Sequence, residues 1–118
     1  MTTTLAALKF FAGTKRVLNM TVYDGDAGSS TPLDLTGMTV TWAIAAKSAE
    51  GVVDAAVVAS KTATIVSASA GTCQVTLLSA DTAELDPGDY WQEWEVTDGA
   101  GEKSVVAVGD VVLRQNIG

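Results

Sequence analysis

The 118-residue sequence contains no histidine and only one cysteine, Cys73. Without histidine there is no Ser-His or Cys-His nucleophile, no histidine general base and no histidine metal ligand. A single cysteine cannot form an internal disulfide or a zinc cluster. We therefore expect a protein that is not an enzyme, with no catalytic residues, no bound metal and no cofactor.

Basic residues are also scarce, since seven lysines and arginines stand against fourteen acidic residues and the net charge is −7. So few cations disfavour a groove that tracks a nucleic-acid backbone. No apolar run approaches the roughly 20 residues that span a bilayer. The first residues, Met1–Leu8, lack the basic start and long apolar segment of a signal peptide. We expect neither a nucleic-acid nor a membrane partner, and no export signal.

The charges are unevenly distributed along the chain. Residues 81–102 carry eight acids and no base, whereas three of the seven bases, Lys9, Lys15 and Arg16, fall within the first sixteen positions. One interpretation is an acidic surface that keeps the domain in solution. The other is that the acidic face of one copy meets the basic arm of a neighbour, because complementary charge sets the register of an interface.

Short alternating apolar runs, separated by glycine-rich turns, are typical of an all-β sandwich. The chain is long enough for one domain, and 47% of its residues are hydrophobic, which suffices for one core. We predict seven to eight antiparallel strands over residues 15–114. Residues 1–14 are predicted as an N-terminal arm or first strand, and residues 115–118 as a mobile tail.

Period-two alternation assigns the inner faces of the strands. The apolar residues that share one face are Leu18, Met20 and Val22, then Met38, Val40, Trp42 and Ile44, and finally Cys73, Val75 and Leu77. Trp42 is therefore a predicted core residue. Between these runs, we interpret residues 45–61 as a hairpin with its turn near Ser48–Gly51. Gly109-Asp110, inside the last strand, predicts a β-bulge.

Ser79–Leu85 is the one segment that favours a helical turn. Asp81 and Glu84 have the spacing of a capping box, and Pro87-Gly88 ends the turn. Tyr90 enters the next strand directly after it, in the position of a tyrosine corner. We predict that the Tyr90 hydroxyl donates a hydrogen bond to the backbone of Asp81–Leu85.

The strand that follows places its aromatic residues on both faces. If Tyr90, Trp94 and Val96 enter the core, then Trp91 points outward beside Glu93 and Glu95. Three interpretations of Trp91 stay open: cover by a neighbouring loop, a contact with another subunit, or a platform for stacking sugars.

The N-terminal segment is the second candidate for an interface. Leu5–Phe11 is either the first strand or an arm that adds to the sheet edge of a partner. The candidate interface residues are Lys9, Phe10, Phe11, Lys15, Arg16, Trp91, Glu93 and Glu95.

Several stretches together carry a family resemblance. They are Phe11-Ala-Gly-Thr14, Leu33-Asp-Leu-Thr-Gly37 before Val40-Thr-Trp42, Gly71 before Cys73–Leu77, Leu78–Tyr90, and Gly109 ahead of Val111 and Leu113. The sequence resembles small tailed-bacteriophage virion proteins similar to the immunoglobulin-like N-terminal domain of phage baseplate upper proteins.

This resemblance implies an immunoglobulin-like sandwich and a non-enzymatic structural role. The expected partners are other virion proteins, contacted by many symmetric copies in the tail, baseplate or fibre attachment of a virion assembled in the host cytoplasm. Two alternatives stay open. One is a capsid decoration protein on the outer head surface, and the other is a carbohydrate-binding module that recognises host-surface polysaccharide through Trp91, with Tyr23 as a possible second ring.

Overall fold

A computed structural model describes residues 3–24, 31–47 and 53–115 of the chain. The predicted turn at Ser48–Gly51 and residues 116–118 of the predicted tail lie outside these ranges.

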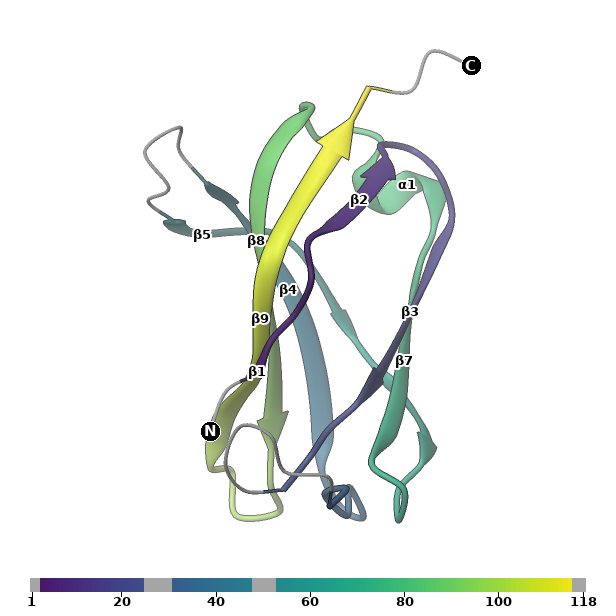
Figure 1. Cartoon of the computed structure of the whole chain (residues 1–118), viewed down its shortest axis with the longest axis vertical. Coiled ribbons are helices and arrows are strands. Elements are labelled where there is room, and N and C mark those ends of the chain that lie inside the picture. The colour runs from purple at the N-terminus through teal and green to yellow at the C-terminus, as the bar shows by residue number, and fades with distance from the viewer. Residues whose placement is uncertain (1–2, 25–30, 48–52, 116–118) are drawn as a thin grey trace.

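Two β-sheets pack face to face (Figure 1). The larger sheet has the order β1-β9-β8-β4-β5, and β2 also pairs with β9. Its strands are β1 (Thr3–Thr4), β2 (Leu8–Phe11), β4 (Thr39–Lys47), β5 (Val53–Thr62), β8 (Gly88–Thr97) and β9 (Lys103–Arg114). The smaller sheet has the order β3-β7-β6, with β3 (Arg16–Thr21), β7 (Thr72–Leu77) and β6 (Thr64–Ser67).

The predicted immunoglobulin-like β-sandwich is confirmed. Within the described residues the one helix is α1 (Ser79–Thr82), inside the predicted helical turn, and β1 is only two residues long. One detail of the prediction is wrong, because β1 and β2 pair with β9 in parallel rather than antiparallel. The reason is topological: β2 and β9 both run toward the end of the sandwich at which β3 begins (Figure 1).

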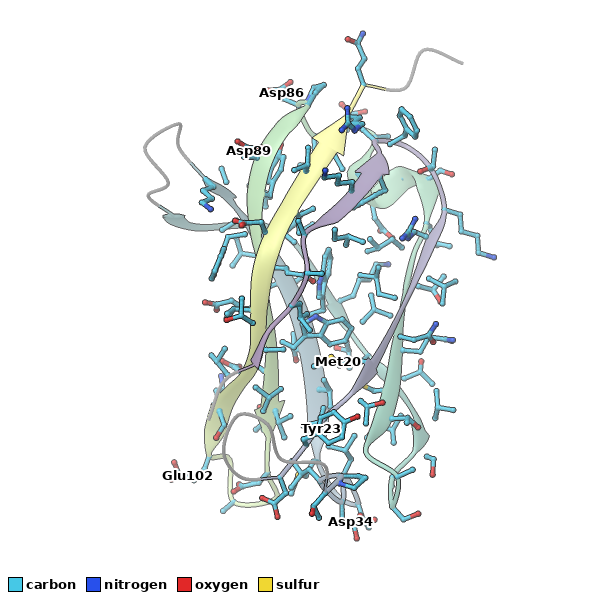
Figure 2. All side chains as sticks on the ribbon, in the orientation of Figure 1. Met20, Tyr23, Asp34, Asp86, Asp89 and Glu102 are labelled. Carbon is cyan, nitrogen blue, oxygen red and sulfur yellow. The ribbon has the colours of Figure 1, made fainter. Side chains whose placement is uncertain are left out.

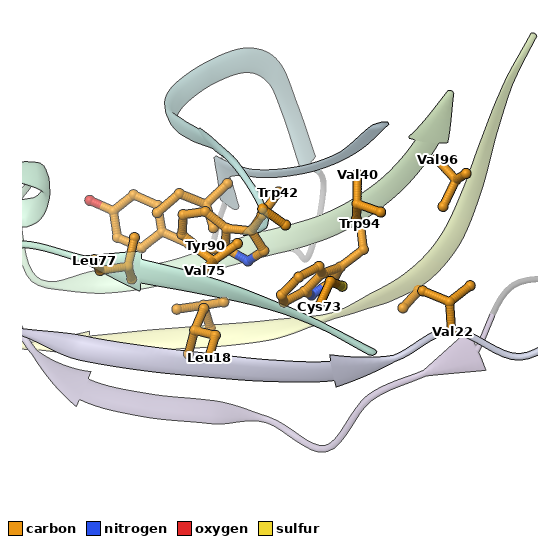
Figure 3. Packing of buried hydrophobic residues seen from close by; sticks show 14 of the residues in the cluster. Leu18, Val22, Val40, Trp42, Cys73, Val75, Leu77, Tyr90, Trp94 and Val96 are labelled. Carbon is orange, nitrogen blue, oxygen red and sulfur yellow. The ribbon is translucent and has the colours of Figure 1, made fainter. Parts of the chain in front are cut away.

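The core lies between the inner faces of the two sheets. Most of the alternating residues predicted to point inward are buried: Leu18, Val22, Val40, Trp42, Ile44, Cys73, Val75 and Leu77. Met20 and Met38, which were predicted to share these faces, are half-buried and pack against the core. Figure 3 shows Trp42, Tyr90 and Trp94 from the larger sheet packed against Val75 and Leu77 of the smaller one. Trp42 is a core residue, as predicted.

One polar side chain lies at the centre of this apolar layer. Gln92 on β8 is 3% exposed, and its Oε1 accepts hydrogen bonds from two indole groups, Trp42 Nε1 at 3.0 Å and Trp94 Nε1 at 3.2 Å. Trp42 and Trp94 face each other across the β4–β8 pair. The amide oxygen therefore gives both buried N–H groups an acceptor in place of the water that they lose on folding.

The predicted bulge at Gly109-Asp110 is wrong. Gly109 and Asp110 pair regularly with Gln92 and Trp91, and the register of β8 and β9 shifts instead between Trp94 and Glu95. The glycine at 109 has a different role, which is to leave space. A Cβ atom there would lie 3.2 Å from Leu5 Cβ and 3.3 Å from Leu5 O, so the absent side chain lets the N-terminal segment cross closely.

The chain crosses from one sheet to the other on both sides of the sandwich. On one side β5 continues into β6 through Ala63, whose N–H donates to Val40 O at 2.8 Å. On the other side residues 12–15 carry β2 into β3. Gly13 in that turn has φ of +75°, which favours glycine, and its N–H donates to the buried Thr82 Oγ1 of α1 at 2.9 Å.

Replacing the central amide tests whether it holds the core together. We expect Gln92→Leu to lower the free energy of unfolding by at least about 2 kcal/mol, because two buried indole N–H groups lose their acceptor. Urea unfolding followed by circular dichroism measures the change.

Gln74→Leu is the matched control. Gln74 Nε2 donates to Asn19 Oδ1 at 3.0 Å on the solvent-exposed side of the smaller sheet, so its loss should cost less than about 1 kcal/mol. Equal losses for the two variants would contradict the special role of Gln92.

Candidate interaction surfaces

The Tyr90 corner joins α1 to β8. The Tyr90 hydroxyl donates to the Asp86 backbone oxygen at 2.6 Å. A hydrogen bond from the Tyr90 hydroxyl to the backbone is thus present, as predicted, but its acceptor is one residue beyond the predicted Asp81–Leu85 turn. Burial raises the pKa of the Tyr90 hydroxyl, and the neighbouring Asp86 carboxylate acts in the same direction.

The predicted capping box at Asp81 and Glu84 is wrong in its register. The helix begins at Ser79, with Leu78 at the N-cap, so Asp81 occupies the third helical position. Its Oδ2 accepts the Leu78 backbone N–H at 2.6 Å and forms an ion pair with Lys61 Nζ at 3.0 Å. Asp81 thus plays the part that the prediction gave to Glu84, which is exposed and lies beyond the end of the helix.

Trp91 lies on the outer face of the larger sheet, as predicted from alternation. On the neighbouring strands it pairs with Ala45 and Asp110. Lys47 Nζ lies 5.4 Å from the centre of its ring and also forms an ion pair with Asp110. The indole is half-buried, and Lys47 of β4 lies over its ring.

Glu93 and Glu95 continue the same face of β8. Their partners on β4 are the short residues Ala43 and Thr41, so the β8 side chains project beyond their neighbours. Neither glutamate forms an ion pair within the described part of the chain. We call Trp91, Glu93 and Glu95 the β8 outer face.

The basic candidates gather at one end of the sandwich. Lys9, Lys15 and Arg16 are exposed near the end of β2 and the start of β3. Arg114, which the sequence analysis did not single out, joins them because its strand β9 pairs with β2 at Phe11. We call these four cations the basic end. Among residues 3–24, 31–47 and 53–115, none of the four forms an ion pair.

The two phenylalanines of β2 point in opposite directions. Phe11 is 53% exposed and stays a candidate contact residue, whereas Phe10 is only 5% exposed and belongs to the core. Phe10 is therefore corrected from interface candidate to core residue. The reason is the pleat of β2, which turns every second side chain toward the smaller sheet.

Trp91 and Tyr23 do not form one aromatic platform. Figure 2 shows Asp89 toward the end of the molecule where β9 ends, and Trp91 is two residues further along β8. Tyr23 lies at the opposite end, near Asp34 and Glu102 (Figure 2). Tyr23 also lines a different hollow, together with Met38 and Val96. A sugar that stacked on Trp91 would not reach Tyr23.

No reactive constellation is present among the described residues. Burial raises the pKa of the Cys73 thiol to about 11, so the thiol is neutral and enclosed by the core. The described acids and cysteine include no group of three that could hold a metal ion. No helix in the described ranges is long and apolar enough to cross a membrane.

Comparison with known proteins adds little to this picture. No protein-family model matches the chain, and no curated protein matches it. Among solved structures, the fold is similar to the crystal structure of CopC from Methylosinus trichosporium OB3b. The two are 12% identical, the match covers 97% of this chain and 91% of that chain, and the TM-score is 0.44. Nothing about CopC beyond its fold transfers to this chain.

The corner can be tested by removing one oxygen atom. Tyr90→Phe should lower the free energy of unfolding by about 0.5–1.5 kcal/mol, the net value of one hydrogen bond. Thermal and urea unfolding measure it. The control is Tyr23→Phe on an exposed ring, which should change stability by no more than about 0.5 kcal/mol. An unchanged midpoint for Tyr90→Phe would show that this hydrogen bond does not stabilise the fold.

The corrected capping role of Asp81 predicts a pH dependence. The Leu78 N–H, and then Lys61, lower the pKa of Asp81 below its ordinary value of 3.8. A carboxyl whose pKa is lower in the folded state stabilises the fold above its unfolded pKa, and this contribution is lost as the pH falls through the folded pKa. Asp81→Asn should therefore lose less stability than the wild type between neutral pH and about pH 3.

Two comparisons sharpen this measurement. Glu84→Gln should keep the wild-type pH profile if Asp81 is the capping residue, and should flatten it if the predicted register were right. Some acid sensitivity remains in every variant, because the hydroxyl and N–H of Thr36 also lower the pKa of Asp34.

Proposed function

We propose that this chain is a non-enzymatic structural protein of a tailed-phage virion that binds neighbouring virion subunits as a tail, baseplate or fibre-attachment component. Its partners are other virion proteins, with no part for nucleic acid or membrane, and its location is the virion assembled in the host cytoplasm.

The β8 outer face is the observation that carries this proposal. It presents a half-buried tryptophan held in place by Lys47, next to two carboxylates without ion-pair partners in the described residues. A preorganised tryptophan loses little entropy on binding, and aromatic residues of this kind dominate protein interfaces. Such a face suits the docking of a neighbouring subunit better than the turnover of a small molecule.

Charge separation supports assembly from several copies. The carboxylates of the β8 outer face and the cations of the basic end lie on different parts of the surface and are not paired with each other. Each copy thus keeps an acidic and a basic surface for its neighbours. In a particle with many symmetric copies, individually weak contacts of this kind add up to firm attachment.

The family resemblance supports the sandwich more strongly than the role. The stretches that carry it include the turn before β4, α1 and the Tyr90 corner, which are features that shape the fold. Identifying the binding partner would therefore decide whether the chain belongs to the tail, the baseplate or the head.

Binding to separated virus parts tests the proposal. The purified chain is mixed with tails and with empty heads of the virus that encodes it, and bound protein is measured after sedimentation. We expect binding to tails, and we expect Trp91→Ala to weaken it at least about tenfold, which is the size of effect typical of a hot-spot residue. Val66→Ala is the control, because Val66 is an exposed apolar residue of the smaller sheet.

Each alternative predicts a different result. Binding to empty heads only would make the chain a capsid decoration protein. Quenching of tryptophan fluorescence by host-surface polysaccharide, lost in Trp91→Ala, would make it a carbohydrate-binding module. If the chain binds neither tails nor heads, the virion proposal is wrong.

A further inference from the structure

A cleft of about 410 Å³ opens on the side of the sandwich where β2 passes into β3. Residues 5–8 form one wall and residues 16–20 of β3 form the other, and Gln92 and Trp94 complete the lining. The turn at residues 12–15 connects the two walls at one end and is held to α1 by the Gly13–Thr82 hydrogen bond. We call this hollow the β3 cleft.

The backbone of β3 faces this cleft with an unused strand edge. In the described chain, β3 is the outer strand of its sheet and pairs only with β7. The phase of that pairing follows from Val22, whose N–H donates to Gly71 O at 2.8 Å and which continues the register of β3. Bonded pairs alternate along antiparallel strands, so Val17, Asn19 and Thr21 direct their N–H and C=O groups away from β7.

This edge is more regular than the outer edge of the larger sheet. The β3–β7 register runs without a shift from Arg16 to Thr21. By contrast, the register of β5 against β4 shifts on both sides of Ala45, and such bulges block the addition of a further strand. The regular edge beside the cleft is therefore the better template for strand addition.

The charge at the cleft indicates what kind of strand fits. Arg16 is the one charged residue in its lining, and Lys9 and Lys15 directly adjoin the lining residues Leu8 and Arg16. None of these three cations has an ion-pair partner in the part of the chain that the structure describes. In a protein of net charge −7, this local excess of positive charge selects for carboxylates. Deeper in the cleft, Leu18 and Trp94 offer apolar contacts.

We propose that the β3 cleft binds an extended segment of a partner protein that adds to the free edge of β3. The segment places apolar side chains toward Leu18 and Trp94 and one or more carboxylates beside Arg16. This site shares Lys9, Lys15 and Arg16 with the basic end, but it contains no residue of the β8 outer face, on which the proposed virion role depends.

A selected peptide provides the probe. A library of short random peptides is selected against the full chain, and the enriched sequence is synthesised for titration calorimetry. We expect the enriched peptides to alternate apolar and polar residues and to carry acidic residues at one end. Nuclear magnetic resonance should show that the amides of Val17, Asn19 and Thr21 become protected from exchange when the peptide binds.

A proline variant isolates the strand edge. Asn19→Pro removes an N–H that points away from β7 and leaves the β3–β7 pairing intact, which an edge strand tolerates. It should weaken peptide binding at least about tenfold relative to Asn19→Ala, which keeps that N–H. If Asn19→Pro does not fold, Thr21→Pro against Thr21→Ala makes the same comparison at another outward-facing N–H.

Charge reversal and an unrelated variant complete the design. Arg16→Glu should weaken binding of the acidic peptide. It should leave unchanged the binding of a peptide that has glutamine in place of each acid. Trp91→Ala should leave peptide binding unchanged, so failure at this site and failure of the virion proposal are distinguishable.

Three results would overturn the proposal. One is that no peptide is enriched over a control protein. A second is equal binding by the proline and alanine variants. The third is a concentration-dependent dimer of the chain itself that Asn19→Pro abolishes, because the occupant of the cleft would then be a second copy.

Discussion

Two tryptophans from adjacent strands share one buried amide oxygen, and the arrangement of the larger sheet depends on this contact. Gln92 accepts both indole N–H groups, so it sets the positions of Trp42 and Trp94 against the smaller sheet. Because side chains alternate along a strand, an inward Gln92 leaves Trp91 and Glu93 pointing outward. The central hydrogen bonds and the β8 outer face are thus two consequences of one register.

The two open sides of the sandwich are closed in different ways. On one side β5 crosses directly into β6, and its outer edge is interrupted by register shifts. On the other side the N-terminal strands cover the edge of β9, which is possible because Gly109 leaves room for Leu5. Within the described residues no N-terminal strand pairs with β3, so a cleft with an available strand edge lies there. The β3 cleft is therefore a consequence of how the sandwich is closed.

The sequence-based predictions that were wrong share one cause: each feature depends on where an element lies or begins in the folded chain. Asp81 and Glu84 have capping-box spacing, but the helix begins earlier, after β7 ends at Leu77, and this moves Asp81 to the third position. Gly109-Asp110 has the composition of a bulge, but the glycine serves a crossing segment from the other end of the chain. Phe10 and Phe11 are adjacent in an apolar segment, and only the position of β2 against β9 decides which one is buried.

Amino-acid order alone specifies the alternation of each strand, the corner at Tyr90 and the lack of histidine, because these are properties of neighbouring residues or of composition. They were enough to predict a β-sandwich, most of its core and an outward Trp91. The tertiary structure decided that Lys47 lies over Trp91, that Arg114 joins the other cations and that β3 has β7 as its one partner strand in the described chain. These features depend on which strands become neighbours, and strand pairing between distant segments is not encoded in any local pattern.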